Sequence, residues 1–566
     1  MNHPIIPIAV QGASRERKRQ APKGRRVDPQ ALAEVQALLG EESRQSDLLI
    51  EHLHKIQDRY GCLSAPHLAA LAQEMRLAQT EVYEVATFYH HFDVVKEGED
   101  APAALTVRVC DGLSCEMAGA RDLIDKLPGI LGRDVRIVPS PCIGRCEQAP
   151  AALVGQHPVP FATTDTIAAK VKAGETRHVP TGFVDYAAYR ANGGYALLRD
   201  CVAGVRDIES VIATMESSGL RGLGGAGFPA GRKWRIVRNE PAPRLMAVNI
   251  DEGEPGTFKD RYYLERDPHR FIEGALIAGW AVDVETIFIY LRDEYHGCRA
   301  MLEAELEKLR ADPPMPGMPK LVLRRGAGAY ICGEESAMIE SIEGKRGMPR
   351  LRPPYVAQVG LFGMPTLEHN FETLHWVRDI LEKGADWFSS HGRNGRKGLR
   401  SFSVSGRVKE PGVKLAPAGI TIQELIDEYC GGMQDGQQFY AYLPGGASGG
   451  ILPASMNNIP LDFDTLQQYG CFIGSAAVVV LSDRDTATSA AINTMKFFKH
   501  ESCGQCTPCR VGTAKALQLM EQPVWDVTLL DELSHVMRDA SICGLGQAAP
   551  NPFDCVVQYF PHELTK

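Results

Sequence analysis

The sequence predicts a multidomain α/β protein, on three observations. The chain has 566 residues, enough for three to five domains at roughly 100–200 residues each. Its hydrophobic spacing changes repeatedly, from the i, i+3, i+4 period of helices to the alternation of strands and back. Eight of its 15 cysteines gather in two tight groups that lie far apart in the chain.

Bulk composition excludes several functions. The net charge of −9 gives no reason to expect nucleic acid as a partner. No run reaches the roughly 18 apolar residues of a membrane span, and the N-terminus has no apolar signal-peptide core. We therefore expect a cytoplasmic chain, in which clustered cysteines indicate metal binding or catalysis rather than disulfides. Most of the other seven cysteines are expected to be small buried hydrophobic residues: Cys62, Cys201, Cys298, Cys332, Cys430, Cys471 and Cys555.

Residues 1–42 form a predicted tail that carries a basic run from Arg15 to Arg26. This composition predicts a solvated, disordered segment. A contact with a partner subunit and an organelle transit peptide are the alternatives, the latter because the tail is rich in arginine and poor in acids up to Asp28.

Residues 43–100 predict a bundle of three short helices. Three sets of apolar residues repeat at helical spacing: Leu49, Leu53 and Ile56; Leu68, Leu71, Ala72 and Met75; Val82, Val85, Ala86 and Tyr89.

Residues 101–178 predict a small α/β domain. Thr106–Cys110 and Asp134–Val138 alternate like strands, with a helical stretch near Met117–Leu127 between them and an apolar run at Ala151–Val154 after them. Residues 185–400 predict a larger α/β domain, because glycine-rich loops alternate with strands such as Leu245–Ile250 and Thr286–Leu291.

The last two predicted domains differ in the spacing of their apolar residues. Residues 401–485 hold short, turn-rich strands and one helix near Ile422–Tyr429, which predicts a β-grasp-like module. Residues 486–566 return to helical spacing, interrupted by the second cysteine group.

The first cysteine group pairs Cys110 with Cys115 and Cys142 with Cys146. Each pair stands where a predicted strand runs into a loop, so the two loops can converge. Four thiolates on adjacent loops suit a [2Fe–2S] cluster, which takes two sulfur ligands per iron. Structural zinc is the alternative, although zinc ribbons use tighter pairs.

The second group places Cys503, Cys506 and Cys509 at two-residue gaps, with Cys543 as a distant fourth ligand. This spacing is typical of a [4Fe–4S] cluster, and zinc is again the alternative. Arg510 either offsets the negative charge of the cluster or is simply solvated.

A glycine-rich loop spans Arg221–Trp234. It contains a formal G-x-G-x-x-G at Gly222, Gly224 and Gly227. The stretch before it, which includes Ile208 and Met215, has helical spacing, so the strand that a Rossmann fingerprint requires is missing. The glycines still let backbone N–H groups approach a phosphate or a flat ring, and Lys233 supplies a positive charge. A purely structural turn is the alternative.

Polar residues gather in three further strings, Asn249–Arg261, Gly326–Ser336 and the segment that holds Asn370 and Thr373. Acidic groups beside a flavin can bind ribose hydroxyls or lower its potential. A Mg²⁺ site or a solvated acidic face is the alternative for any one of them.

These motifs carry a resemblance to known families. Residues 43–178, with all four cysteines, resemble the thioredoxin-like 24-kDa-type [2Fe–2S] subunit of respiratory NADH dehydrogenases. Residues 185–566 resemble the 51-kDa-type flavoprotein subunit of NADH dehydrogenases and its relatives in NAD-reducing hydrogenases and formate dehydrogenases.

The resemblance implies a set of cofactor contacts. FMN would be held by Gly222, Gly224, Lys233, Asn249, Asp251, Glu252, Tyr330, Gly333, Glu334, Asn370 and Thr373. NAD(H) would lie over the flavin against Gly225, Phe228, Glu254, Glu335 and Arg352. Phe228 would stack on adenine with Tyr355 as a further wall, and Glu252 and Glu335 would tune the flavin. His369, Ile236 and Arg352 depart from the residues common in relatives, which affects details of NAD binding.

The implied chemistry is electron transfer between a two-electron carrier and one-electron carriers. Nicotinamides exchange two electrons as hydride, iron–sulfur clusters exchange one, and a flavin does both, so no catalytic protein residue is needed. A non-catalytic electron-transfer subunit and a zinc-bound scaffold protein remain the hypotheses of other classes.

The fusion of both modules in one chain helps to indicate which enzyme complex contains this chain. The segments Phe439–Asn457 and Tyr469–Asp483 resemble formate dehydrogenase β-subunits, whereas bidirectional hydrogenases that fuse both modules often lack the complete four-cysteine set. The resemblance implies a partner α-subunit with iron–sulfur clusters and a molybdopterin site for molybdenum or tungsten, which oxidises formate and sends electrons to NAD⁺. A diaphorase subunit of an NAD-reducing hydrogenase or of an NADH–quinone oxidoreductase is the alternative.

Overall fold

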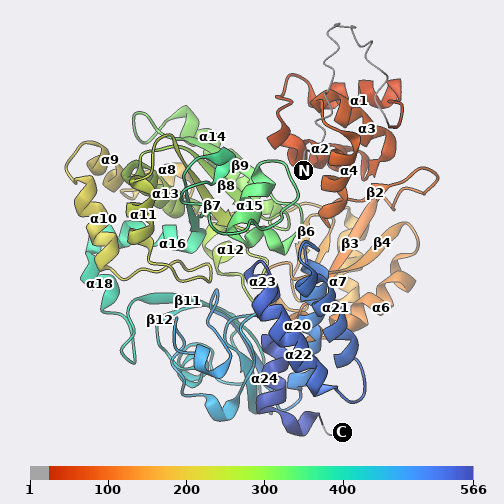
Figure 1. The fold of residues 1–566 in the computed structure, drawn as a ribbon, viewed down its shortest axis with the longest axis vertical. Coiled ribbons are helices and arrows are strands. Elements are labelled where there is room, and N and C mark those ends of the chain that lie inside the picture. The colour runs from red at the N-terminus through yellow and green to blue at the C-terminus, as the bar shows by residue number, and fades with distance from the viewer. Residues whose placement is uncertain (1–23, 565–566) are drawn as a thin grey trace, which may run out of the picture.

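The computed structural model describes residues 24–564, and its domains follow one another around the molecule (Figure 1). An N-terminal helical bundle packs next to a small α/β domain, and a larger α/β domain lies beside both. A β module and a C-terminal helical domain lie at the end of the molecule opposite the bundle. Among the described residues, no helix is long and apolar enough to cross a membrane.

The three helices predicted in residues 43–100 are present, and a fourth helix from the preceding segment joins them in the N-terminal bundle. They are α1 (Pro29–Leu39), α2 (Leu49–Tyr60), α3 (Ala65–Met75) and α4 (Gln79–Phe88), accompanied by the short parallel pair β1 (Leu63–Ser64) and β2 (Val94–Val95).

The prediction of a disordered tail to residue 42 is wrong for the segment that forms α1. Ala31, Val35 and Leu39 recur at four-residue spacing and are buried, and α1 packs against α3. Asp28 is the N-cap of this helix and accepts a hydrogen bond from Ala31 N at 2.9 Å. Most of the basic run lies outside the described residues.

The small α/β domain has a four-stranded sheet in the order β4-β3-β5-β6, with β3 and β4 parallel and the other pairs antiparallel. Its elements are β3 (Leu105–Cys110), α5 (Leu113–Met117), α6 (Ala120–Leu131), β4 (Val135–Ser140), β5 (Ala152–Val154), β6 (His157–Val159) and α7 (Thr164–Ala173). The predicted strands and helix are all present.

The larger α/β domain is built on a parallel sheet in the order β10-β7-β8-β9. The strands are β7 (Arg244–Ile250), β8 (Val284–Leu291), β9 (Lys320–Arg325) and β10 (Thr366–Asn370). The helices are α8 (Tyr186–Ala191), α9 (Ala196–Val202), α10 (Ile208–Ser217), α11 (Ala230–Arg238), α12 (Lys259–Leu264), α13 (Pro268–Val282), α14 (His296–Ala311), α15 (Glu335–Ile342), α16 (Phe371–His375), α17 (Val377–Lys383) and α18 (Ala385–Ser389).

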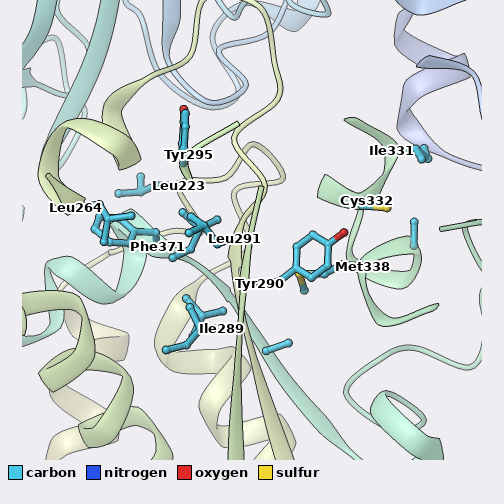
Figure 2. Packing of buried hydrophobic residues seen from close by; sticks show 14 of the residues in the cluster. Leu223, Leu264, Ile289, Tyr290, Leu291, Tyr295, Ile331, Cys332, Met338 and Phe371 are labelled. Carbon is cyan, nitrogen blue, oxygen red and sulfur yellow. The ribbon is translucent and has the colours of Figure 1, made fainter. Parts of the chain in front are cut away.

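Both faces of this sheet are buried. Ile289 and Leu291 point to one face, toward Leu264 and Phe371, while Tyr290 points to the other, toward Cys332 and Met338 (Figure 2). This alternation follows from the two-residue repeat of a strand. The carboxyl ends of the four parallel strands meet at one edge, which is where ligands bind in open α/β sheets.

The β module has a five-stranded sheet in the order β12-β11-β15-β13-β14. Its strands are β11 (Leu399–Gly406), β12 (Gly412–Pro417), β13 (Phe439–Leu443), β14 (Leu452–Pro453) and β15 (Ala477–Ser482), and its helix α19 (Ile422–Glu424) continues as a π-helical turn to Tyr429. The C-terminal domain has α20 (Ala487–Glu501), α21 (Thr507–Met520), α22 (Val527–Ala540), α23 (Gly544–Ala548) and α24 (Asn551–Tyr559). All seven scattered cysteines are buried, as predicted for most of them.

Candidate functional site

The first cysteine group converges on one enclosed cavity. Cys110 ends β3, Cys115 lies in α5, and Cys142 and Cys146 follow β4, and all four thiols are buried. The Sγ atoms of Cys142 and Cys146 are 3.3 Å apart, and Gly144 N donates a hydrogen bond to Cys142 Sγ at 3.4 Å. The parallel pairing of β3 with β4 brings the two loops together.

The electrostatics of this cavity favour a bound cation. Hydrogen bonds from Cys110 and Cys146 hold the pKa of Cys142 well below its usual value, whereas the pKa values of Cys110 and Cys146 are raised well above theirs by the thiols beside them. Four thiols packed this closely cannot all ionise on their own. Iron would replace the thiol protons and compensate the charge, so the donor set suits a cluster.

The second cysteine group lines a separate enclosed cavity. Cys506 is the N-cap of α21, Cys509 lies in the first turn of α21, and Cys543 is the N-cap of α23, so two helix N-termini face the cavity with Cys503. Burial raises the pKa of Cys509 to about 11 and that of Cys543 to about 12. Only Cys509 is fully buried and the other three are half-buried, and thiols at helix N-termini suit a cluster that needs thiolates.

Arg510 lies beside this cavity. Its guanidinium donates to the backbone oxygen of Gly504 in the ligand loop. The side chain is exposed, as the solvated alternative predicted, and it also holds the ligand loop in place.

The glycine-rich loop connects α10 to α11, so the predicted absence of a preceding strand is confirmed. Gly222 N donates to Phe228 O at 2.8 Å, which closes the loop on itself. A Cβ at Gly224 would lie 2.9 Å from Asn370 Cβ, so this glycine lets the loop approach the end of β10. Leu223 N donates to Thr373 Oγ1 at 3.0 Å, which joins the loop to α16.

At the carboxyl end of β7, Asn249, Asp251 and Gly333 form a tight cradle. Asn249 Nδ2 donates to Gly333 O at 2.9 Å, and Asp251 N donates to Asn249 Oδ1 at 3.0 Å. Within residues 24–564, no partner lies within hydrogen-bond distance of the buried Oδ2 of Asp251. Burial raises the pKa of this carboxyl well above its usual value. An orphaned buried oxygen beside a glycine suits a ligand that supplies hydroxyl groups, as the ribityl chain of FMN does.

Lys233 reaches the same edge of the sheet. Its Nζ donates to the backbone oxygen of Glu368 at 3.0 Å, and Asn249 Nδ2 donates to Glu368 Oε1 at 3.2 Å. Sequence reasoning missed Glu368, because β10 has the sequence TLEHN and no apolar alternation that would mark its acid as buried. Burial, and then the negative charge of Glu335, raise the pKa of Glu368 to about 8.

The carboxylate of Glu252, a predicted flavin residue, is bonded to protein groups. It accepts from Asp260 N at 2.8 Å, from Arg261 N at 3.0 Å and from the hydroxyl of Tyr295 at 2.8 Å. These donors belong to the start of α12 and to the loop after β8, so the side chain points into the protein. The contacts favour a role in holding α12, and burial raises the pKa of Glu252 to about 7.

The remaining acidic residues are also tied to protein groups. Glu254 accepts from the hydroxyl of Tyr330 and from Ser448 N, the latter at 2.8 Å. Glu334 caps α15 by accepting from the backbone N of residues 336 and 337, both at 3.0 Å, and pairs with Arg352. Glu335 lies 3.6 Å from the same guanidinium.

Two of the residues predicted to bind the nucleotide carry exposed aromatic rings. Phe228 is 39% exposed and Tyr355 is 56% exposed, so both rings are available to a planar ligand. Ile236 is also exposed. His369 instead accepts a hydrogen bond from Trp234 Nε1 at 2.7 Å, and burial holds its pKa well below the usual value. This histidine is therefore a buried residue of the core.

Comparisons with known proteins cover every domain. The chain matches the families described as thioredoxin-like [2Fe-2S] ferredoxin (residues 35–174), Nuo51 FMN-binding domain (215–379), SLBB domain (401–452) and NADH-ubiquinone oxidoreductase-F iron-sulfur binding region (489–566). The mitochondrial NADH-ubiquinone oxidoreductase 51 kDa subunit of Neurospora crassa is 40% identical over 375 residues, which cover 62% of this chain and 76% of the relative. The chain belongs to the family of NADH-ubiquinone oxidoreductase 51 kDa subunits.

Two other relatives show how far the likeness extends. The mitochondrial NADH dehydrogenase [ubiquinone] flavoprotein 1 of Dictyostelium discoideum is 40% identical, over 62% of this chain and 78% of the relative. A chain of the NAD⁺-reducing [NiFe]-hydrogenase in the H2-reduced state superposes with a TM-score of 0.81 at 32% identity, covering 92% of each chain.

These matches confirm the predicted fold class and the cofactor set. This member of the 51 kDa family has a thioredoxin-like [2Fe–2S] domain, an FMN-binding domain, an SLBB module of β-grasp type and a C-terminal [4Fe–4S] domain, and it is an NADH-binding chain. The residue-by-residue contacts stay predictions.

Proposed function

We propose that this chain is a diaphorase subunit that exchanges electrons between NAD(H) and its two iron–sulfur clusters through FMN. The observation that carries the proposal is that residues predicted to bind FMN and NAD(H) lie between the two cysteine cavities. Pro255 lines the first cavity and Ile331 lines the second, and their neighbours Glu254 and Tyr330 are hydrogen-bonded to each other. One hydrogen bond therefore joins the wall of one cavity to the wall of the other.

The protein's part in this chemistry is positioning. FMN, when bound, supplies the exchange between two-electron and one-electron steps. Asn249 and Gly333 shape the cradle, the loop at Gly224 packs closely against Asn370, and Phe228 offers a face for adenine. The two cysteine cavities are enclosed, so the clusters would be shielded from solvent.

The test is an NADH assay on the complete, cofactor-loaded chain. NADH should bleach the flavin absorbance and support ferricyanide reduction. Phe228→Ala should raise the KM for NADH by about tenfold, since stacking on one base is worth about 1–3 kcal/mol. Phe161→Ala is the matched control, because that ring is exposed on the small α/β domain rather than on the nucleotide domain. Bound flavin that NADH does not reduce would contradict the proposal.

We further propose that the electrons come from formate, oxidised on a separate subunit with a molybdopterin site for molybdenum or tungsten. Support comes from the likeness of segments 439–457 and 469–483 to formate dehydrogenase β-subunits and from the complete set of four cysteines in the first group. The second candidate is a diaphorase subunit of an NAD⁺-reducing hydrogenase, favoured by the likeness to that structure along almost the whole chain.

Co-purification from the native cell separates these candidates. A complex that reduces NAD⁺ with formate and contains molybdenum or tungsten supports the first candidate. A complex that reduces NAD⁺ with hydrogen and contains nickel supports the second and rules out the first. Reduction of NAD⁺ by neither substrate, with a quinone as acceptor for NADH, would place the chain in a respiratory enzyme.

A further inference from the structure

Two histidines and a glutamate meet where the N-terminal bundle contacts the C-terminal domain, and the proposed function uses none of them. His90 follows α4, and His500 and Glu501 lie in the last turn of α20. One candidate ligand atom of each side chain lies within 4.8 Å of those of the other two. The centroids of the two imidazole rings are 4.0 Å apart. The fold therefore brings together three metal-binding side chains from two domains.

Glu501 is the buried member of this group, with 5% of its surface exposed. Its Oε2 accepts a hydrogen bond from Tyr330 N at 2.9 Å, and its Oε1 lies 3.1 Å from His500 Nδ1. Within residues 24–564, no lysine or arginine forms an ion pair with Glu501, whose ionic partner is His500. A buried carboxylate is costly without a cation, and the C-terminal end of the 15-residue helix α20 adds partial negative charge at the same place. The group therefore favours a bound cation.

Zinc fits these ligands and their spacing. Two imidazoles and one carboxylate are a known set of protein ligands for a four-coordinate zinc ion with one open position, whereas Mg²⁺ and Ca²⁺ prefer oxygen ligands alone. Ligand atoms of a tetrahedral zinc ion are about 3.3 Å apart, close to the 3.1 Å between His500 Nδ1 and Glu501 Oε1. Burial lowers the pKa of His90, so its neutral ring has a lone pair to offer. The hydrogen bond with Glu501 raises the pKa of His500, so a zinc ion has to displace a proton there.

We propose that His90, His500 and Glu501 bind a zinc ion that joins the N-terminal bundle to the C-terminal domain. Both histidines are exposed and His500 lines a cavity of about 280 Å³, so the ion can enter from solvent. The hydrogen bond from Tyr330 N orients the carboxylate, as outer partners of zinc ligands do. None of the three residues lines either cysteine cavity, so the inference does not depend on the proposed function.

The test is calorimetric titration with Zn²⁺ of the oxidised chain, loaded with flavin and both clusters and washed with a mild chelator. The wild type should bind one zinc ion at this site. His90→Gln and His500→Gln should each weaken that binding more than tenfold, since even the loss of a residue that only orients a zinc ligand costs about 10- to 100-fold in affinity. His535→Gln is the matched control, because this exposed histidine on α22 also lies beside a carboxylate, that of Asp531 at 3.6 Å, and it should follow the wild type. Absence of zinc binding in the wild type, or equal affinity in the wild type and both site variants, would overturn the inference.

A second measurement does not depend on the variants. Imidazole also suits Cu²⁺, and the oxidised clusters and oxidised flavin give no electron paramagnetic resonance signal of their own. One equivalent of Cu²⁺ added to the wild type should therefore give a spectrum split by the nitrogens of two imidazoles, and a spectrum without nitrogen splitting would overturn the inference. Failure of both metal tests in a chain whose flavin NADH still reduces would refute the zinc site and leave the proposed function intact.

Discussion

Replacement of Asp251 by alanine tests whether the cradle at the end of β7 is a flavin site. The Oδ2 atom of Asp251 is buried without a partner in the described part of the chain, and an added Cβ at Gly333 would lie 3.8 Å from it. A hydrogen bond between a buried group and a ligand hydroxyl is worth about 1–3 kcal/mol when the alternative is an unpaired atom. Asp251→Ala should therefore raise the Kd for FMN by roughly 5- to 150-fold.

The assay is titration of the flavin-free protein with FMN, followed by quenching of FMN fluorescence. Asp251→Asn is the matched control, because the amide keeps the shape and the hydrogen-bonding capacity of a protonated carboxyl, and its Kd should stay within about threefold of the wild type. Iron content should be the same in all three proteins. An Asp251→Ala variant that binds FMN within about twofold of the wild type would refute the assignment of this cradle.

The same residue predicts an effect on stability. The pKa of Asp251 is raised above its unfolded value near 4, so the flavin-free wild type loses stability as pH rises above about 4. Asp251→Asn cannot ionise and should lose less stability between pH 4 and pH 7, as measured by thermal unfolding. An equal loss in both proteins would show that this carboxyl is not the cause.

Three further predictions concern the cluster, the loop and the core. Cys543→Ser should lower the iron content by about four atoms per chain while NADH still bleaches the flavin, as iron analysis and absorbance would show. Gly224→Ala should weaken FMN binding more than tenfold in the fluorescence titration, because its Cβ would lie 2.9 Å from Asn370 Cβ. Lys259→Met should destabilise the chain by about 3–5 kcal/mol in denaturant unfolding, because it leaves the buried carboxylate of Glu372, 3.1 Å from Lys259 Nζ, without its cation. Unchanged iron, unchanged FMN affinity and unchanged stability, respectively, would contradict them.

The interlocking of distant segments explains why some site residues could be predicted and others could not. Cys110 and Cys142 were predictable because each ends or follows a strand whose alternation is visible locally. Glu252 was assigned to the flavin by resemblance, but only the structure shows its carboxylate bound to the start of α12. His369 looked like a change in the nucleotide site, and the structure instead places it in the core against Trp234.

The sequence alone determined the order of the domains, the ligand spacing of both clusters and the rejection of a Rossmann loop, because these depend on residues close together in the chain. The tertiary structure decided what depends on contact between distant segments. It placed Glu254 and Tyr330, 76 residues apart, in one hydrogen bond between the two cysteine cavities. It also buried Glu368 against Asn249, 119 residues away, and so created an acid whose protonation depends on burial and on its neighbours. No local pattern carries that information, since the desolvation of a carboxyl group is set only when the chain packs around it.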